Sequence, residues 1–292
     1  MKINSDLFCI VLTYSYLCGM NYTLNCNGRL LSLAEPQVMG ILNVTPDSFY
    51  GSSRQQTEAA IAQRVEEILS QGGCMVDVGA CSTRPDSEPV SEAEEMERLH
   101  RALPIVRRVA PEAVVSVDTF RPSVARMVVE DYGVDIINDV GEGSATRPER
   151  EQAADMFRMV ARLRVPYIYT SRKATMREVL LDCAEAVDRL RSLGQKDILL
   201  DPGFGFGKTL EQNYEVLNAL ERMQMIGLPV LVGVSRKSMI YRLLDTEPGQ
   251  ALNGSTVLHT IALQKGASIL RVHDVREAVE CCRLVRQTMN SK

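Results

Sequence analysis

Residues Asp197–Thr209 read DILLDPGFGFGKT. The apolar run Ile198–Leu200 is short enough for one fully buried strand, and Pro202, which has no backbone N–H, ends that strand. Three glycines then alternate with two phenylalanines and are followed by Lys208. Glycines let the backbone approach a flat ligand closely, and aromatic rings offer the ligand a face to stack on. With Asp201 at the end of the strand, this stretch indicates a binding site.

Two familiar phosphate-binding motifs do not fit this stretch. A P-loop needs a glycine five positions before its Gly-Lys pair, and that position holds Pro202. A dinucleotide fingerprint needs Gly-x-Gly-x-x-Gly, whereas the spacing is Gly-x-Gly-x-Gly. A glycine-rich turn without a ligand is the alternative when the stretch is taken alone. A buried strand that ends in a polar residue recurs along the chain, however, and this recurrence favours the binding site.

Composition and charge limit the class of protein. The chain has 292 residues, 45% hydrophobic and 24% charged, which is typical of a globular protein. A net charge of −4 and a pI near 5.6 give no electrostatic reason to expect nucleic acid or an anionic membrane as a partner. The eight cysteines show no spacing typical of zinc sites. We interpret them as reduced thiols and predict a cytoplasmic protein.

The N-terminal region is expected to lie outside the main domain. Residues 1–19 resemble a weak signal segment, but no small-residue cleavage site follows and the apolar run is too short to span a membrane. Met20 is a plausible start, so we expect an extension at residues 1–19 and one domain at residues 20–292. The segment Tyr22–Leu33 is centred on Asn27-Gly28 and predicts a small hairpin.

From residue 38 onwards the chain alternates buried strands with amphipathic helices. The expected helices include 57–71, 91–110, 122–132, 176–193 and about 276–289, with a capping box at Ser91 and Pro122 near a helix start. The expected strands are 38–44, 75–79, 114–118, 135–139, 166–169, 198–201, 229–234 and 269–272. Eight strand–helix units favour a (β/α)8 TIM barrel of the α/β class, preceded by the hairpin. An open doubly wound sheet is the alternative.

Polar side chains stand at the ends of most of these strands. In a TIM barrel the chemistry is carried by the C-terminal ends of the strands. An isolated aspartate there is usually a helix cap or a turn residue, but capping is a poor explanation for so many. The polar strand-end residues are Asn43, Asp77, Asp118, Asn138, Asp201, Ser235, Arg236, Lys237, Arg271 and His273.

The strand-end motifs resemble those of the dihydropteroate synthase family, in the family's order. The similarity extends from Val38 to Val285, nearly the whole chain. The motifs are GILNVTPDSF (40–49), DVGACSTRP (77–85), SVDT (116–119), IINDV (136–140), LLDPGFGFGKT (199–209), VGVSRKSMI (232–240) and ILRVHDV (269–275).

The resemblance implies a transferase of folate biosynthesis. Such enzymes condense 6-hydroxymethyl-7,8-dihydropterin diphosphate with p-aminobenzoate, release pyrophosphate and use Mg²⁺. By similarity, Asp118, Asn138 and Asp201 hold the pterin, with Lys237 at its carbonyl side and Phe206 in the wall. The other residues implied are Asn43 for Mg²⁺, Thr83, Arg271 and His273 for the diphosphate, and Arg84 and Ser238 for p-aminobenzoate. The catalytic residues implied are Lys237, Arg271 and His273, and the family also implies a homodimer.

Two loops depart from the family pattern. Gly51 replaces an aspartate that helps to close the site in relatives, so we expect slower condensation with nearly unchanged pterin binding. Residues 169–176 replace a Met-His-Met segment and a Gln-Gly loop, and the connection to the next helix looks short. Two alternatives therefore remain, a slow or non-catalytic pterin-binding paralogue and a methyltransferase that handles a reduced folate. Ser235-Arg236-Lys237 and Arg271-x-His273 argue against the methyltransferase, which has no diphosphate to hold.

Overall fold

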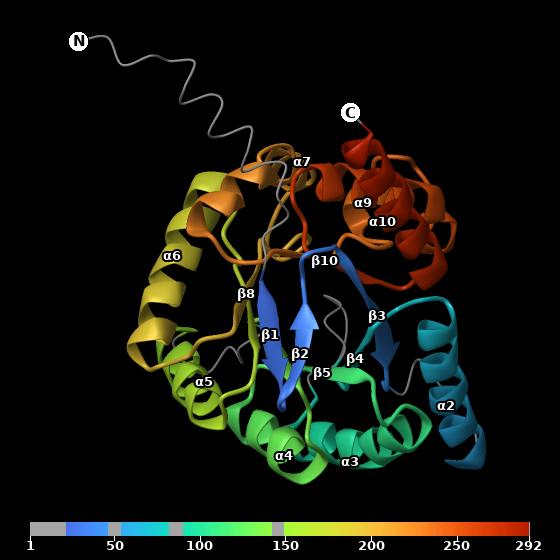
Figure 1. Cartoon of the computed structure of the whole chain (residues 1–292), viewed down its shortest axis with the longest axis vertical. Coiled ribbons are helices and arrows are strands. Elements are labelled where there is room, and N and C mark those ends of the chain that lie inside the picture. Colours follow the sequence, from blue (N-terminus) through green and yellow to red (C-terminus); the bar gives the residue numbers. More distant parts are fainter. Residues whose placement is uncertain (1–21, 46–53, 82–89, 142–148, 292) are drawn as a thin grey trace.

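The computed structural model describes residues 22–45, 54–81, 90–141 and 149–291. Eight parallel strands form one sheet in the order β8-β7-β6-β5-β4-β3-β10-β9. A parallel bridge between Leu200 and Val230 joins the two end strands, so the sheet forms a nearly closed barrel (Figure 1). This confirms the predicted barrel and excludes the open sheet. The strands are β3 (Gln37–Asn43), β4 (Met75–Gly79), β5 (Val114–Asp118), β6 (Ile136–Asp139), β7 (Tyr167–Thr170), β8 (Ile198–Asp201), β9 (Leu231–Val232) and β10 (Ile269–Val272).

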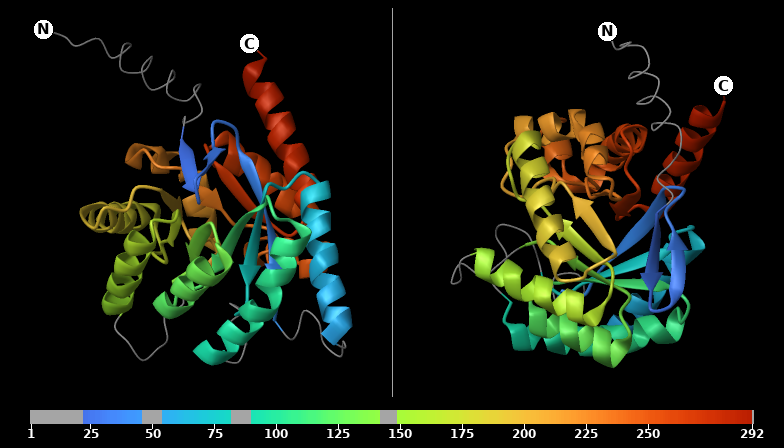
Figure 2. Two further views of the ribbon diagram at one scale, coloured as in Figure 1. Left: turned by 60° about the horizontal axis from the view of Figure 1, so that its bottom comes forward. Right: turned by 60° about the vertical axis from the view of Figure 1, so that its left-hand side comes forward.

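Helices surround the strands, as the views in Figures 1 and 2 show. The side chain of Ser91 accepts a hydrogen bond from the Glu94 N–H at 3.3 Å, so Ser91 caps its helix as predicted. The reciprocal half of the predicted capping box is absent among the described residues, and the Glu94 carboxylate pairs with Arg98. Pro122 is in the first turn of its helix, as predicted. The helices are α2 (Arg54–Ser70), α3 (Glu92–Val109), α4 (Pro122–Tyr132), α5 (Glu149–Leu163), α6 (Met176–Ser192), α7 (Leu210–Asn218), α8 (Ser238–Tyr241), α9 (Leu252–Gln264) and α10 (Val275–Asn290), with the 3₁₀ turns η2 (Leu220–Ile226) and η3 (Pro248–Gln250).

The barrel interior is apolar in the half that lies nearer the N-terminal ends of the strands. Each of the eight strands contributes one buried side chain to a single cluster, and the hairpin covers this cluster from below. Its buried members are Met39, Met75, Val114, Ile136, Ile168, Leu199, Leu231 and Ile269 from the strands, with Leu24, Cys26 and Leu33 from the hairpin region. The barrel is therefore a packed core at this end and not a pore.

The predicted hairpin is present as β1 (Thr23–Cys26) and β2 (Arg29–Ser32). Its turn has positive φ angles at Asn27 (52°) and Gly28 (86°), the combination that a two-residue type I′ turn requires. The Asn27 side chain donates to the carbonyl of Gly133 at 2.9 Å and to the buried carboxylate of Asp135 at 3.1 Å. The turn is thus fastened to the barrel as well as packed under it.

Strand β6 begins one residue later than expected, and β9 is much shorter than expected. We predicted residues 229–234, but β9 contains only Leu231–Val232. Pro229 has no N–H to give to a ladder. The carbonyl of Val234 accepts from the Lys237 N–H at 3.2 Å, so the chain is already turning there.

Some predictions fall on residues that the structure does not describe. They include the extension at residues 1–19, the altered position Gly51, and Thr83 and Arg84. Among the described residues, no helix has the length and apolar character needed to cross a membrane.

Candidate active site

A polar layer lies directly above the apolar cluster of the barrel. Side chains of a strand alternate between its two faces, so a residue two positions after an inward-facing one also faces inward. On β4, β6, β7, β8 and β10 the residue two positions after the apolar layer is polar. These residues are Asp77, Asn138, Thr170, Asp201 and Arg271, and on β5 the positions are Ser116 and Asp118. The predicted pterin residues Asp118, Asn138 and Asp201 therefore belong to one layer.

Arg271 joins two strands across the barrel. Its Nε donates to Oδ2 of Asp77 at 2.6 Å, and its Nη2 donates to Oδ2 of Asp118 at 2.9 Å. Burial lowers the pKa of the guanidinium, but the two carboxylates outweigh burial and raise it. Arg271 is therefore a fixed and permanently charged group.

Asp77 also binds Asn138, whose Nδ2 donates to Oδ2 of Asp77 at 3.2 Å. Several buried oxygens of this layer have no hydrogen-bond partner among the described residues. They are Oδ1 of Asp77, Oδ1 of Asn138, Oγ of Ser116 and Oγ1 of Thr170. Buried acceptors without donors cost free energy, which indicates a place where a ligand or water supplies the donors.

Asp201 stands at the start of the glycine-rich turn. Its Oδ1 accepts from the Gly203 N–H at 2.7 Å, and burial raises the pKa of the carboxyl. Gly203 has a φ of 72°, and a Cβ there would lie 2.0 Å from the carbonyl oxygen of Ser171. Lys208 donates from Nζ to the carbonyls of Gly203 at 2.8 Å and of Ser171 at 3.4 Å. Gly203 is therefore required because the loop after β8 passes very close to Ser171 in the loop after β7.

Lys237 lies over the same turn. Its Nζ donates to the carbonyl oxygen of Phe204 and stands 4.4 Å from the ring centre of Phe206. Burial lowers the pKa of this amine to about 8, although Asp201 opposes the shift. The structure thus brings Lys237, Phe206 and Asp201 together, as the sequence predicted.

His273 follows β10 and is neutral at physiological pH. Burial first, and then the charge of Arg271, lower the pKa of its imidazole to about 4. Its backbone N–H donates to Oγ of Ser235 at 3.1 Å, and its carbonyl accepts from Arg64 at 2.6 Å. Its ring can therefore offer a hydrogen bond but no positive charge.

Asn43 and Ser238 lie at the rim of the barrel. Asn43 ends β3 and is exposed, and its Oδ1 lies 3.2 Å from the place that a Cβ on Gly79 would take. Ser238 begins α8 directly after Lys237. Thr83 and Arg84 lie outside the described residues.

Two residues have roles that the motifs did not indicate. Asp77 was noted only as a polar strand residue, although its position two residues after Met75 places it inside the barrel. Arg236, in the Ser-Arg-Lys motif, binds both carboxylate oxygens of Asp274 at 2.8 and 2.7 Å. It also donates to the carbonyls of Pro248 and Gly249, so it fastens neighbouring loops.

The connection after β7 is short, as predicted, and it is held at both ends. Helix α6 begins at Met176 with a capping box on Thr175. Ser171 donates from Oγ to Asp182 at 2.7 Å. Arg172 donates from Nη1 to the carbonyl of Gly141 at 2.7 Å. The altered connection is therefore tied to α6 and to the loop that follows β6.

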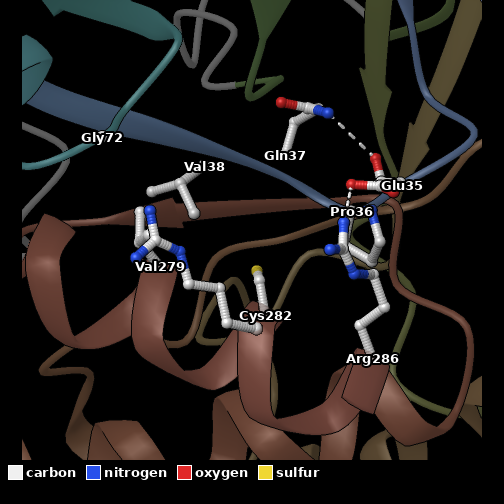
Figure 3. A pocket seen from close by; sticks show the side chains of 9 residues that line it. Glu35, Pro36, Gln37, Val38, Gly72, Val279, Cys282 and Arg286 are labelled. Atoms are coloured by element: carbon white, nitrogen blue, oxygen red, sulfur yellow. Dashed lines mark hydrogen bonds and ion pairs between the residues drawn. The ribbon is translucent and has the colours of Figure 1, made fainter. Parts of the chain in front are cut away.

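A separate cavity of about 370 Å³ lies near the start of β3, away from the strand ends that carry the polar layer (Figure 3). Gln37 and Val38 line one side of it, and Arg283 of α10 lines the other. An ion pair between Glu35 and Arg286 crosses its edge. This cavity takes no part in the candidate active site.

The fold and the polar layer define a barrel enzyme, and comparison with known proteins gives its class. A family model described as "Pterin binding enzyme" matches residues 39–273. A dihydropteroate synthase from Escherichia coli strain K12 is 38% identical over 276 residues, which are 91% of this chain and 96% of that protein. One from Bacillus subtilis is 35% identical and covers 87% of this chain and 88% of its own length.

Solved structures agree with this result. A Xanthomonas albilineans dihydropteroate synthase with 4-aminobenzoic acid has a TM-score of 0.81 and 35% identity, and the match covers 92% of this chain and 99% of that one. A Coxiella burnetii dihydropteroate synthase in complex with pteroic acid has a TM-score of 0.79 and 30% identity, with 93% and 100% covered. The chain therefore belongs to the pterin-binding enzymes and, among them, to the dihydropteroate synthase family of transferases.

Proposed function

We propose that this protein condenses 6-hydroxymethyl-7,8-dihydropterin diphosphate with p-aminobenzoate to give 7,8-dihydropteroate and pyrophosphate. The polar layer carries this proposal. It gathers acidic and amide acceptors above an apolar floor, and such a set suits the flat, donor-rich edge of a pterin. The names of the relatives and their ligands, 4-aminobenzoic acid and pteroic acid, support the same substrates.

In this proposal Asp118, Asn138 and Asp201 hold the edge of the pterin. Phe206 forms a wall, and Lys237 donates to the pterin carbonyl, which its ammonium reaches from above the ring of Phe206. Thr83 and Arg84 keep the diphosphate and p-aminobenzoate roles that the resemblance implies, and Ser238 acts with Arg84. Fixed donors and acceptors of this kind lower the cost of orienting the substrates.

In the reaction, the bond between the pterin methylene and the diphosphate oxygen breaks, and its electron pair leaves with the diphosphate. The arylamine nitrogen then forms a bond to the methylene carbon and loses a proton. Arg271 stabilises the negative charge that grows on the leaving group. His273, which is neutral, supports the diphosphate by donating a hydrogen bond.

The donor set fits Mg²⁺ only if the substrate completes the coordination. Among the described residues, no group of three or more His, Cys, Asp or Glu side chains is placed to hold a metal. Asn43 offers one exposed amide oxygen at the rim, and Mg²⁺ commonly combines few protein oxygens with phosphate oxygens and water. Mg²⁺ bound in this way supplies positive charge to the leaving diphosphate.

We further propose a homodimer formed through the helices α9 and α10. Val257 of α9 is 50% exposed and Leu284 of α10 is 69% exposed, and the two helices pack on each other. Leu244 is also exposed and lies beside Gly254 of α9. Exposed apolar side chains on adjoining elements are typical of a contact surface.

Turnover by the purified protein tests the proposal. 6-Hydroxymethyl-7,8-dihydropterin diphosphate, p-aminobenzoate and Mg²⁺ should give 7,8-dihydropteroate and pyrophosphate in equal amounts. The altered connection after β7 favours one second candidate, a pterin-binding paralogue without useful turnover. Pterin binding without product would establish that candidate, and absence of both would overturn the proposal.

A further inference from the structure

Asp77 lies at the floor of the polar layer. Its side chain is 0% exposed, and it pairs in register with Ser116 of β5, whereas Asp118 pairs with Asn138 of β6. Its neighbour two positions earlier, Met75, belongs to the apolar cluster. Asp77 is therefore the deepest carboxylate of this network, directly on the apolar floor.

Asp77 decides which way Asn138 faces. An ionised carboxylate only accepts hydrogen bonds, whereas an amide has one accepting oxygen and one donating nitrogen. Oδ2 of Asp77 already accepts from Nε of Arg271 at 2.6 Å, so this oxygen acts as an acceptor. Asn138 must therefore turn its Nδ2 toward Asp77, at 3.2 Å, and its Oδ1 is left for another partner.

The buried polar atoms that remain unpaired beside Asp77 are hydrogen-bond acceptors. Oδ1 of Asp77 and Oδ1 of Asn138 are both buried and have no partner among the described residues. A ring edge that donates N–H groups satisfies such oxygens, whereas a ring oxygen placed against one of them leaves that acceptor unpaired. Buried polar groups left unpaired are the strongest source of discrimination between similar ligands.

We propose that Asp77 is a positioning residue that sets the ligand preference of the site, by fixing Asn138 as an acceptor and Arg271 in its place across the barrel. The site then favours a 2-amino ring edge over a 2-oxo edge of the same shape. This inference rests on the proposed function, because it assumes that the ligand is a pterin.

An amide at position 77 would remove this control. Asp77→Asn keeps the size of the side chain, but it can donate to Asn138 and allows the amide of Asn138 to reverse. It also removes one of the two carboxylates that bind Arg271. The variant should therefore accept either ring edge.

The experiment compares two ligands by calorimetry, 6-hydroxymethylpterin and 6-hydroxymethyllumazine, which carries an oxygen in place of the 2-amino group. The wild-type protein should prefer the pterin by at least about 100-fold, and Asp77→Asn should reduce this preference by about tenfold or more. An unchanged preference in the variant would overturn the inference. Failure of the wild-type protein to bind the pterin would instead overturn the proposed function.

A matched control is available outside the site. Glu95 and Arg121 form an ion pair with side-chain exposures of 0% and 17%, against 0% and 16% for Asp77 and Arg271. Glu95→Gln should lower the melting temperature as a broken buried pair does, but leave the pterin preference intact. A loss of preference in this control would mean that general destabilisation explains the effect of Asp77→Asn.

A second measurement needs no variant, in case Asp77→Asn does not fold. The side-chain amide protons of Asn138 should exchange slowly with solvent in wild-type protein, both free and with the pterin bound, because they face Asp77. Their signals can be followed by nuclear magnetic resonance. Fast exchange in the free protein would place Nδ2 toward solvent and overturn the inference.

Discussion

At the scale of single residues, the charge of Lys237 should set the upper pH limit of activity. Burial lowers the pKa of its amine to about 8, so it is mostly protonated at pH 7 and mostly neutral at pH 9. Only the protonated amine offers a positive charge to the pterin carbonyl. We therefore expect kcat/KM to fall as pH rises through about 8, since this ratio reports groups of the free enzyme.

Lys237→Arg should move this fall to higher pH, although its absolute rate will be lower, because arginine stays protonated. Lys208 provides the matched control, because burial also lowers its pKa to about 8 while its Nζ donates to two carbonyls. Lys208→Arg should not change the pH at which kcat/KM falls. If only Lys208→Arg shifts the pH at which kcat/KM falls, the titrating group is Lys208.

Asp201→Asn should weaken pterin binding without unfolding the protein. An amide must present an N–H where the ligand expects an acceptor, and the loss of a charge-assisted contact costs roughly 2–4 kcal/mol, about 30- to 1,000-fold in affinity. Burial raises the pKa of this carboxyl, which means that its ionised form is destabilising at neutral pH. The variant should therefore melt at the same temperature or higher. Wild-type affinity in calorimetry would show that Asp201 is not the anchor.

The sequence predicted some of these residues and missed others for a physical reason. Asp118, Asn138 and Asp201 were found because each stands at or next to the end of a strand and lies in a motif shared with the family. The role of Asp77 depends on contacts between strands that lie far apart in the chain, and these contacts require the register of the sheet. The neutral state of His273 depends on how its ring is buried beside Arg271, and the motif that contains both residues does not show this burial.

At the scale of elements, the hairpin of β1 and β2 works as a plug. Leu24 is fully buried under the eight-strand apolar cluster. Leu24→Ala should lower the free energy of unfolding by about 2–5 kcal/mol, the range for a buried leucine that leaves a cavity. Chemical denaturation measures this loss, and Leu30→Ala is the control, since Leu30 on β2 is 76% exposed. Equal effects of the two changes would contradict the plug.

Element boundaries were predictable where local signals are strong. Four strands, β4, β5, β8 and β10, match their predicted bounds, because each is a short apolar run with clear ends. The turn at Asn27 was predictable from its own chemistry. The length of β9 was not, since it is limited by how Pro229 and Val234 use their backbone groups within the closed barrel.

At the scale of the whole molecule, stability and chemistry are divided along the barrel axis. The apolar cluster and the hairpin fill one end, and the charged layer occupies the other. Buried charges such as Asp77 and Arg271 are costly to keep there, and they are retained together because each satisfies the other. The outer helices carry none of the proposed pterin residues, so they can form the contact between two copies of the chain.

The proposed dimer is tested on those helices. Leu284→Glu combined with Val257→Glu places charges on the exposed apolar face of α10 and α9, and charge in an apolar contact is strongly unfavourable. Wild-type protein should sediment at about twice its chain mass of 32.4 kDa, and the double variant at that mass. Leu181→Glu is the matched control, because Leu181 is 63% exposed on α6, a helix on another side of the barrel from α9 and α10 (Figure 1). The control should remain dimeric.

The double variant should still bind pterin, because every proposed pterin residue comes from one barrel. A monomeric wild-type protein would contradict the dimer, and a monomeric control would place the contact on α6.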